Sequence, residues 1–295
     1  MAEPERRIET VAVLGAGTMG LGIAHVSALA GYGTALFDVE EAALDRALST
    51  IGANLDKGIQ LGKVEAATAD EARRRLRPTS DLAEAVRKAD LVIEAVPENI
   101  ALKVATFRSV VELCPRHAYL ASNTSGLSVT EMAAATDRPE RFAGMHFFNP
   151  VHVMKLLELV RGLDTTAGTL AVLAEVGARM GKTVVTVNES PGFVTSRINA
   201  LIGNEAFRML ETGVASAEDI DRALKLGLNH PMGPFELVDL VGLDVRLSIL
   251  QFLHRTLGDT YRPSPLLERY VQAGRLGRKV GRGVYEYDRD GRRRS

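Results

Sequence analysis

The sequence predicts an α/β fold, a Rossmann-like doubly wound sheet with an added helical arm, followed by an all-α C-terminal domain. In the first half, short buried strands alternate with helical segments, and the connection across residues 38–78 is too long for a simple crossover. After residue 190 the apolar periodicity becomes helical almost throughout. The turn Glu189-Ser-Pro-Gly192 marks the change, so we predict domains at 1–189 and 190–295.

Composition and charge exclude several classes of protein. The net charge is −1, with 36 Lys and Arg against 37 Asp and Glu, so no overall field attracts nucleic acid or an anionic membrane. No apolar run approaches the roughly 20 residues that span a bilayer, and the N-terminus lacks the apolar segment of a signal peptide. The single cysteine, Cys114, indicates a reducing compartment, and no Cys/His cluster has metal-ligand spacing. We expect a cytoplasmic protein without metal, nucleic-acid or membrane partners.

The first strand–turn–helix unit has the pattern of a dinucleotide site. A buried strand at 10–14 leads into Gly15-Ala-Gly17-Thr-Met-Gly20, a helix follows, and a second strand at 34–37 ends in Asp38. Gly15 permits the tight turn, Gly17 lets the backbone approach a pyrophosphate, and Gly20 lets the helix pack close to the sheet. The residues predicted to contact the cofactor here are Gly15, Ala16, Gly17, Thr18, Met19 and Gly20.

Asp38 discriminates between the two nicotinamide cofactors. A carboxylate at the end of the second strand accepts hydrogen bonds from ribose hydroxyls and repels a 2′-phosphate. No Arg or Lys follows in Val39-Glu40-Glu41 to offset its charge. We therefore predict NAD rather than NADP.

Two further strands, at 91–96 and 118–121, continue the parallel sheet on either side of a helix at 100–113. Polar loops at 97–99 and 122–126 follow these strands. Ligands in doubly wound sheets bind outside the carboxyl ends of the strands, so these loops are expected to converge on one crevice.

The long stretch after Asp38 is predicted to form the added arm. It contains two helical segments, at about 40–61 and 64–76. Lysines and arginines, among them Lys63, make the arm basic. For Arg73–Arg75 we favour an ordinary solvated helix face over a binding surface.

A chain reversal at Asn149-Pro150 sets a histidine opposite a carboxylate. If the chain folds back about a loop centred on position 152, residues whose numbers sum to 304 face each other, as His146 and Glu158 do. Glu158 shares its strand face with apolar residues, so we expect it to be buried and to need the imidazole as a partner. The pair suits general acid/base catalysis near neutral pH, but a structural His–Glu pair explains these residues equally well.

The second half is predicted to be a helical domain. Helices are expected from residue 193, from the capping pattern at Ser216, and from Pro234, which suits a first helical turn. Together they carry more apolar residues than one domain face needs. We therefore expect a homodimer interface in this domain.

Seven motifs, spread over nearly the whole chain, resemble those of one enzyme family. They are Val-Leu-Gly-Ala-Gly-Thr-Met-Gly20, Val-Ile-Glu-Ala-Val-Pro-Glu98-Asn, Ser-Asn-Thr-Ser125, His146-Phe-Phe-Asn-Pro-Val, Pro191-Gly-Phe-Val, His230-Pro-Met-Gly-Pro and Gly277-Arg-Lys-Val-Gly-Arg-Gly-Val-Tyr285. The chain is similar to the 3-hydroxyacyl-CoA dehydrogenase family, especially to its short bacterial 3-hydroxybutyryl-CoA dehydrogenases. The resemblance implies an NAD-binding domain, a helical domain that carries the dimer interface, and reversible oxidation of an L-3-hydroxyacyl-CoA to the 3-ketoacyl-CoA.

The resemblance also implies roles for individual residues. His146 would take the proton of the substrate hydroxyl, Glu158 would orient the imidazole, and Ser125 would hydrogen-bond the reacting oxygen. Further family positions that line the cofactor are Glu98, Lys103, Ser125, Asn149 and Lys279. On the arm, Asn54 and Lys63 would meet the CoA moiety.

Ser196 departs from the family pattern, which usually has Asn at this position. The carboxamide would donate a hydrogen bond to the oxygen as negative charge develops. We hypothesise that Ser196 keeps this catalytic role through an altered contact or a bridging water. Asn199, one helical turn later, is an alternative donor, and Ser196 as a mere packing residue is a second alternative.

Other functions are compatible with parts of the sequence. A dehydrogenase that uses a lysine base on a free 3-hydroxy acid is disfavoured by His146, Glu158 and the basic arm. An enzyme acting on a thioester of an acyl carrier protein would have the same reacting groups. A catalytically silent NAD-binding protein gains slight support from Ser196.

Overall fold

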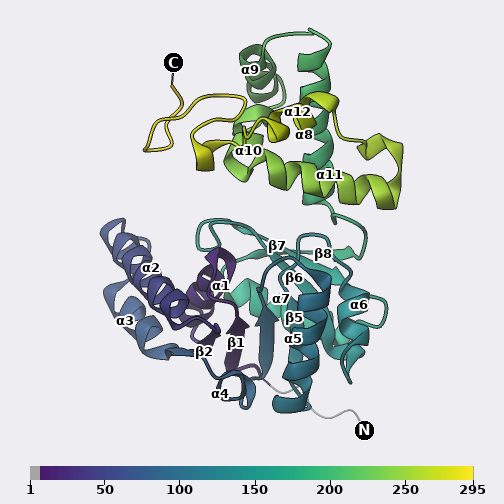
Figure 1. The fold of residues 1–295 in the computed structure, drawn as a ribbon. Helices are drawn as coiled ribbons and strands as arrows, with labels where there is room; N and C mark the ends of the chain where they lie inside the picture. The colour runs from purple at the N-terminus through teal and green to yellow at the C-terminus, as the bar shows by residue number, and fades with distance from the viewer. Residues whose placement is uncertain (1–6, 295) are drawn as a thin grey trace. The chain divides into compact units, whose positions relative to one another are not determined.

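The computed structural model describes residues 7–294, and the chain divides into two compact units after Ser190 (Figure 1). The first unit has an α/β architecture, and the second is built from helices joined by short turns. The predicted fold class is therefore confirmed.

Within residues 7–190, eight strands form one sheet in the order β3-β2-β1-β4-β5-β6-β7-β8. The strands are β1 (Thr10–Leu14), β2 (Gly33–Phe37), β3 (Leu76–Thr79), β4 (Leu91–Glu94), β5 (Tyr119–Ser122), β6 (Phe142–Phe147), β7 (Leu156–Arg161) and β8 (Thr183–Asn188). The β6–β7 pair is antiparallel, and the other neighbouring strands run parallel. The strand order reverses between β1 and β4, where doubly wound sheets bind their ligands.

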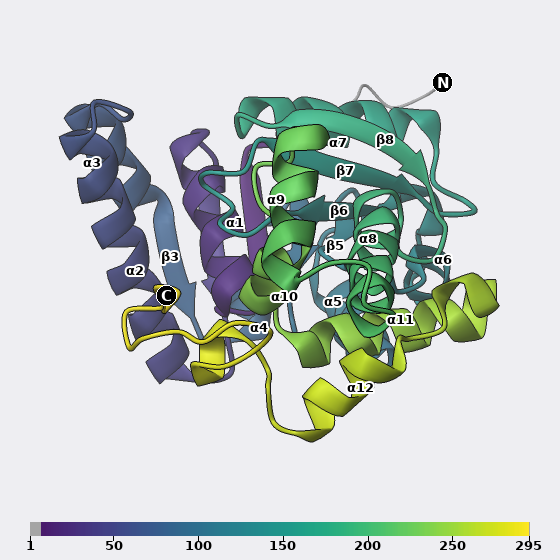
Figure 2. The same cartoon turned by 90° about the horizontal axis from the view of Figure 1, so that it is seen from above.

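Helices connect these strands and form the predicted arm. They are α1 (Thr18–Leu29), α2 (Glu41–Gln60), α3 (Ala66–Arg75), α4 (Leu82–Val86), α5 (Ile100–Leu113), α6 (Val129–Ala134) and α7 (Ala167–Arg179), with the 3-10 helix η1 (Pro139–Arg141). Figures 1 and 2 show α2 and α3 side by side near the β3 edge of the sheet. The arm is thus a helical pair inserted between β2 and β3.

The sequence did not predict β3, which pairs in parallel with β2. The predicted helix at 64–76 instead covers only residues 66–75, and the chain becomes extended at Leu76. The strand reads Leu-Arg-Pro-Thr, and its Pro78 is tolerated because β3 lies at the edge of the sheet. A short, polar edge strand carries almost no periodic signal.

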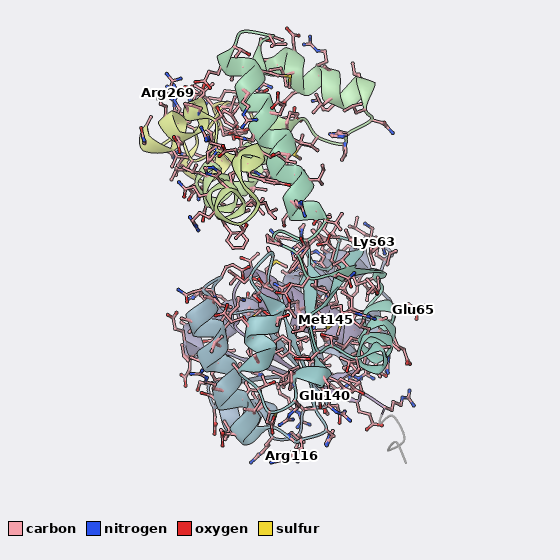
Figure 3. All side chains as sticks on the ribbon, turned by 90° about the vertical axis from the view of Figure 1, so that its right-hand side faces the viewer. Lys63, Glu65, Arg116, Glu140, Met145 and Arg269 are labelled. Carbon is pink, nitrogen blue, oxygen red and sulfur yellow. The ribbon has the colours of Figure 1, made fainter. Side chains whose placement is uncertain are left out.

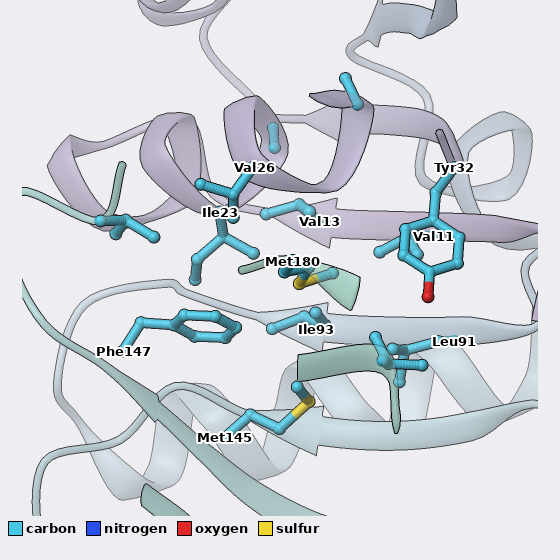
Figure 4. Close-up of a cluster of buried hydrophobic side chains, with 14 of the residues drawn as sticks. Val11, Val13, Ile23, Val26, Tyr32, Leu91, Ile93, Met145, Phe147 and Met180 are labelled. Atoms are coloured by element: carbon cyan, nitrogen blue, oxygen red, sulfur yellow. The ribbon is translucent and has the colours of Figure 1, made fainter. Parts of the chain in front are cut away.

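The core of the first unit lies between its sheet and its helices. Met145 of β6 is fully buried, whereas the charged side chains of Lys63, Glu65, Arg116 and Glu140 lie on the outside (Figure 3). Close packing joins α1 to the central strands. Figure 4 shows this cluster, which includes Val11, Val13, Ile23, Val26, Tyr32, Leu91, Ile93, Met145, Phe147 and Met180.

The second unit has its own core. Its helices are α8 (Thr195–Glu211), α9 (Ala217–Gly227), α10 (Pro234–Val241), α11 (Leu243–Leu257) and α12 (Pro265–Gln272), with the 3-10 helices η2 (Asp259–Tyr261) and η3 (Arg278–Val280). Phe207 and Phe235 meet edge to face at 5.2 Å inside it. The predicted starts are confirmed for α9, whose Ser216 side chain accepts a hydrogen bond from the Asp219 amide at 3.1 Å, and for α10, which begins at Pro234.

Two kinds of feature, a membrane-spanning helix and a metal site, are absent from the described part of the chain. None of its helices combines the length and the apolar character needed to cross a membrane. Residues 7–294 also contain no group of three or more His, Cys, Asp and Glu side chains arranged to hold a metal ion.

Candidate active site

In the glycine turn after β1, Gly15 and Gly20 are required by close contacts, and Gly17 leaves one side open. Gly15 has a φ of +100°, and a Cβ there would lie 2.8 Å from the Ala95 carbonyl oxygen. At Gly20 a Cβ would lie 1.7 Å from the Gly15 carbonyl oxygen, so only glycine lets α1 approach the turn. Gly17 has no atom within 4 Å of its would-be Cβ, and it precedes the first residue of α1 without a capping side chain. The open side at Gly17 and the amides of α1 fit a pyrophosphate group.

Asp38 lies directly beside this turn. One carboxylate oxygen accepts a hydrogen bond from the Ala16 amide at 2.7 Å, and the other accepts one from the Glu40 amide at 3.0 Å. These bonds hold the charge at the end of β2 while leaving further lone pairs for hydroxyl groups. The arrangement fits the ribose of NAD and opposes a 2′-phosphate.

His146 and Glu158 are paired as the hairpin register predicted. Strands β6 and β7 place them directly opposite each other, and the chain turns through Asn149-Pro150. The imidazole Nδ1 lies 2.8 Å from a carboxylate oxygen of Glu158, and the two residues are 5% and 1% exposed. A carboxylate acceptor fixes the tautomer with hydrogen on Nδ1.

Neighbouring residues fix the end of β6. The Asn123 side chain accepts a hydrogen bond from the Phe147 amide at 2.9 Å, which ties the loop after β5 to the residue after the histidine. The Phe148 ring lies 4.4 Å from the His146 ring, centroid to centroid. Both contacts restrain the backbone and the ring of His146, so its position is set before any substrate binds.

Glu98 and Ser125 come together from two different loops. One oxygen of Glu98 accepts hydrogen bonds from the Thr124 hydroxyl at 2.6 Å and from the Ser125 amide at 2.8 Å. Both Glu98 and Ser125 are exposed, and they follow β4 and β5 at the carboxyl edge of the sheet. The predicted convergence of these two loops is therefore confirmed.

Lys103 lies beneath Glu98 and not at the surface. The resemblance implied that it lines the cofactor, but its side chain is 0% exposed. Its ammonium group lies 2.7 Å from Glu94 and 3.2 Å from Glu98. Lys103 therefore supports Glu98 from beneath.

The other predicted residues lie on other elements of the chain. Asn149 is exposed in the turn between β6 and β7, and on the arm Asn54 is half-buried in α2 while Lys63 is exposed beyond it (Figure 3). In the second unit, Lys279 lies 2.6 Å from Asp244, and Ser196 is half-buried in the first turn of α8.

The charges of Arg73 and Arg75 are locally neutralised. Arg73 pairs with Asp56 at 2.5 Å and with Asp70 at 2.9 Å, while Arg75 pairs with Glu71 at 2.6 Å. These partners sit on the arm itself. These ion pairs support the interpretation of Arg73 and Arg75 as part of an ordinary helix face and not of a binding surface.

Glu94 is the main residue that the sequence reasoning left out. It ends β4, is 0% exposed, and accepts hydrogen bonds from the Lys103 ammonium at 2.7 Å and the Ser122 hydroxyl at 2.6 Å. Burial raises the pKa of this carboxyl, and the Lys103 ammonium opposes the rise. The available signal was a lone glutamate inside the apolar run 91–96, because such a charge is rarely buried without a partner.

A basic group lies where α1 meets the β6–β7 turn. The His25 and His152 rings stack at 5.3 Å, and Lys182 donates hydrogen bonds to the carbonyl oxygens of Val151 and of Met154, the latter at 2.9 Å. Burial, and then the charges of His152 and Lys182, lower the pKa of His25 to about 4. Burial and Lys155 lower the pKa of Lys182 to about 8.

We expect His25 to make the fold acid-sensitive. Its pKa is about 4 in the native state against 6.5 in the unfolded chain, so between these values the unfolded chain binds the extra proton. Stability is therefore full above pH 6.5 and falls by up to about 3 kcal/mol as the pH drops toward 4. Urea unfolding at pH 7.5, 6 and 5 should show a shallower loss for His25→Gln than for the wild type. Parallel losses would contradict this assignment.

Comparison with known proteins agrees with the geometry along the whole chain. Residues 10–190 match the family model "3-hydroxyacyl-CoA dehydrogenase, NAD binding domain", and residues 192–287 match "3-hydroxyacyl-CoA dehydrogenase, C-terminal domain". A probable 3-hydroxybutyryl-CoA dehydrogenase from Bacillus subtilis is 46% identical over 282 residues, which cover 95% of this chain and 98% of that protein. A 3-hydroxybutyryl-CoA dehydrogenase from Bradyrhizobium diazoefficiens is 45% identical over 281 residues, 95% of this chain and 96% of that protein.

Solved structures give the same result. The crystal structure of (S)-3-hydroxybutyryl-CoA dehydrogenase from Ralstonia eutropha has a TM-score of 0.92 and 43% identity, and the match covers 96% of this chain and 100% of that chain. Its similarity extends over both units. The chain, with its NAD-binding glycine turn and its buried histidine–glutamate pair, belongs to the 3-hydroxyacyl-CoA dehydrogenase family.

Proposed function

We propose that this protein oxidises L-3-hydroxybutyryl-CoA to acetoacetyl-CoA with NAD and catalyses the reverse reduction. The observation that carries the proposal is the His146–Glu158 pair, buried and only 2.8 Å apart, on the same sheet as the glycine turn. Relatives named 3-hydroxybutyryl-CoA dehydrogenase, 44–46% identical over most of the chain, support this choice of substrate.

In the oxidation, His146 Nε2 takes the proton from the substrate 3-hydroxyl while the C3 hydrogen leaves with its electron pair. Bound NAD supplies the acceptor for this hydride. Glu158 accepts the Nδ1 hydrogen bond and offsets the charge of the imidazolium that forms. Ser125 hydrogen-bonds the reacting oxygen, and Ser196 donates a second hydrogen bond to it as negative charge develops.

The remaining predicted residues bind the cofactor or the CoA moiety, and they come from both domains. In the NAD-binding domain, residues 1–189, the glycine turn holds the pyrophosphate and Asp38 binds the ribose hydroxyls. Glu98, Asn149 and Lys279 line the cofactor, the last of these from the helical domain, residues 190–295. The arm contributes Asn54 and Lys63 to the CoA moiety.

Steady-state oxidation of NADH with three acceptors tests the proposed function. The acceptors are acetoacetyl-CoA, an acetoacetyl thioester of acyl carrier protein, and free acetoacetate. All three contain the same keto group, and they differ in the carrier to which the acetoacetyl group is attached or in having none. We expect turnover with acetoacetyl-CoA at a kcat/KM well above that of the other two. Preference for the carrier-protein thioester or for the free acid would reassign the substrate, and NADH binding without turnover would indicate a silent NAD-binding protein.

We also propose a cytoplasmic homodimer that associates through the helical domain. Its exposed apolar side chains support this, because Ile198, Leu226, Leu228 and Leu240 are 50–80% exposed. The only cysteine, Cys114, is an unpaired buried thiol, as expected in a reducing compartment. Light scattering should give a mass of about 64 kDa, twice 31.8 kDa. A mass near 32 kDa at micromolar concentration would contradict the dimer.

A further inference from the structure

We infer that the buried Glu94–Lys103 pair is a positioning device for catalysis: Lys103 holds Glu98, and Glu98 holds the loop that presents Ser125. The inference deepens the proposed function and rests on the contact proposed there between Ser125 and the reacting oxygen. In this assignment Glu94 and Lys103 act through other residues and are positioning residues, whereas Glu98 both lines the cofactor and holds the Ser125 loop.

The pair joins three elements at the carboxyl edge of the sheet. Glu94 is the last residue of β4, and Lys103 lies in the first turn of α5. Their side chains are both 0% exposed, with the ammonium 2.7 Å from the carboxylate. The same Glu94 oxygen accepts a hydrogen bond from the Val96 amide at 2.7 Å, and its other oxygen accepts one from the Ser122 hydroxyl at 2.6 Å. Glu94 therefore fixes the starts of both loops that carry Glu98 and Ser125.

Lys103 extends this network to the surface. Beyond Glu94, its ammonium donates a hydrogen bond to the Val96 carbonyl at 3.2 Å and lies 3.2 Å from one oxygen of Glu98. These three acceptors match the three donors of an ammonium group. Glu98 is 44% exposed on its side chain, so Lys103 gives a partly solvated carboxylate a buried anchor. Lys103 restrains one oxygen and leaves the other facing the Ser125 loop.

That second oxygen completes the chain of contacts. It accepts hydrogen bonds from the Thr124 hydroxyl at 2.6 Å and the Ser125 amide at 2.8 Å. The Thr124 hydroxyl in turn accepts a hydrogen bond from the Leu127 amide at 2.9 Å. The loop conformation thus depends on a carboxylate whose own position depends on a buried ammonium. The position of Ser125, and with it the hydrogen bond that Ser125 makes to substrate, depends on this loop conformation.

Stability alone is a weak reason for such a pair. Desolvation of two buried charges cancels much of their attraction, and apolar replacements of similar volume are often neutral or stabilising. The Glu94–Lys103 pair differs from an isolated ion pair because each partner also bonds a loop that reaches the candidate active site. The expected signature is therefore a catalytic defect that persists after folding stability has been restored.

The test compares Lys103→Met with the double variant Glu94→Gln/Lys103→Met. The single variant leaves Glu94 buried without its cation and should lower the melting temperature. The double variant removes both charges and should recover most of that loss. Both should lower kcat for acetoacetyl-CoA on the order of tenfold with a smaller change in KM, because the Ser125 hydrogen bond acts mainly in the transition state. Lys103→Arg, which keeps the charge, should retain more kcat than Lys103→Met.

A double-mutant cycle with Ser125→Ala separates positioning from a general structural role. If Lys103 acts through Ser125, the double variant should lower kcat far less in the Ser125→Ala background than in the wild type. Glu98→Gln, which keeps an acceptor for the Ser125 amide but removes the charge that pairs with Lys103, should show the same dependence on Ser125. Lys225→Met removes the cation of another 2.7 Å pair, with Glu236, and should leave kcat unchanged.

Three results would overturn the inference. Equal losses of kcat in the two backgrounds, an unchanged kcat in the double variant, or no effect of Ser125→Ala in an active wild type would each remove the link to Ser125. Failure of the proposed function looks different, because the wild type itself would then not oxidise NADH with acetoacetyl-CoA.

Discussion

Replacement of His146 by glutamine is expected to lower kcat on the order of 10³-fold while leaving NADH binding intact. Glutamine can keep a hydrogen bond to Glu158, but it cannot take up the proton that leaves the substrate hydroxyl. The residue it replaces is 5% exposed and 2.8 Å from Glu158, so the surrounding geometry requires little change. Steady-state reduction of acetoacetyl-CoA, together with a fluorescence titration of NADH, measures the two properties separately.

The same variant distinguishes the catalytic pair from a structural one. If the pair only stabilised the β6–β7 hairpin, His146→Gln would lower the melting temperature and weaken NADH binding along with turnover. Glu158→Gln is a useful companion, because the amide keeps an acceptor for Nδ1 but removes the negative charge. It should lower kcat less than His146→Gln does, since the imidazole remains able to accept a proton.

The parts of the site that the sequence predicted depend on local patterns. The glycine turn, its strand and Asp38 lie within residues 10–38, and Gly15 and Gly20 have steric needs that no other residue meets. The His146–Glu158 contact could equally be predicted from the sequence, because a hairpin register follows from the position of its turn. A one-residue slip would have moved Glu158 to the opposite face of β7, away from the histidine.

The parts that it missed depend on contacts between elements. Glu94 and Lys103 are only nine positions apart, yet their pairing requires the end of a strand and the first turn of the next helix to face each other. The sequence carried no information on that orientation, and the family resemblance assigned Lys103 to the cofactor. His25 and His152 are separated by 127 positions and meet only because α1 packs against the β6–β7 turn. Strand β3 went undetected because a short polar edge strand has no periodicity to recognise.

Replacement of Ser196 by alanine is expected to lower kcat on the order of 10²-fold, equivalent to about 3 kcal/mol of transition-state stabilisation. Ser196 lies in the first turn of α8, a helix of 17 residues, so its hydroxyl lies at the positive end of the helix dipole. A donor in that field gains strength as negative charge develops on the reacting oxygen. The loss should therefore appear in kcat more than in the KM for acetoacetyl-CoA.

Two matched variants decide which side chain donates this hydrogen bond. Ser196→Asn introduces the side chain that the family usually has at this position and should retain turnover, whereas Ser196→Ala removes the donor without adding bulk. Asn199→Ala should leave kcat nearly unchanged if Ser196 is the donor, although both residues are half-buried on α8. A normal kcat for Ser196→Ala would reduce Ser196 to a packing residue. If Asn199→Ala alone lost activity, the hydrogen bond would come from one helical turn further along α8, because residues three apart on a helix share a face.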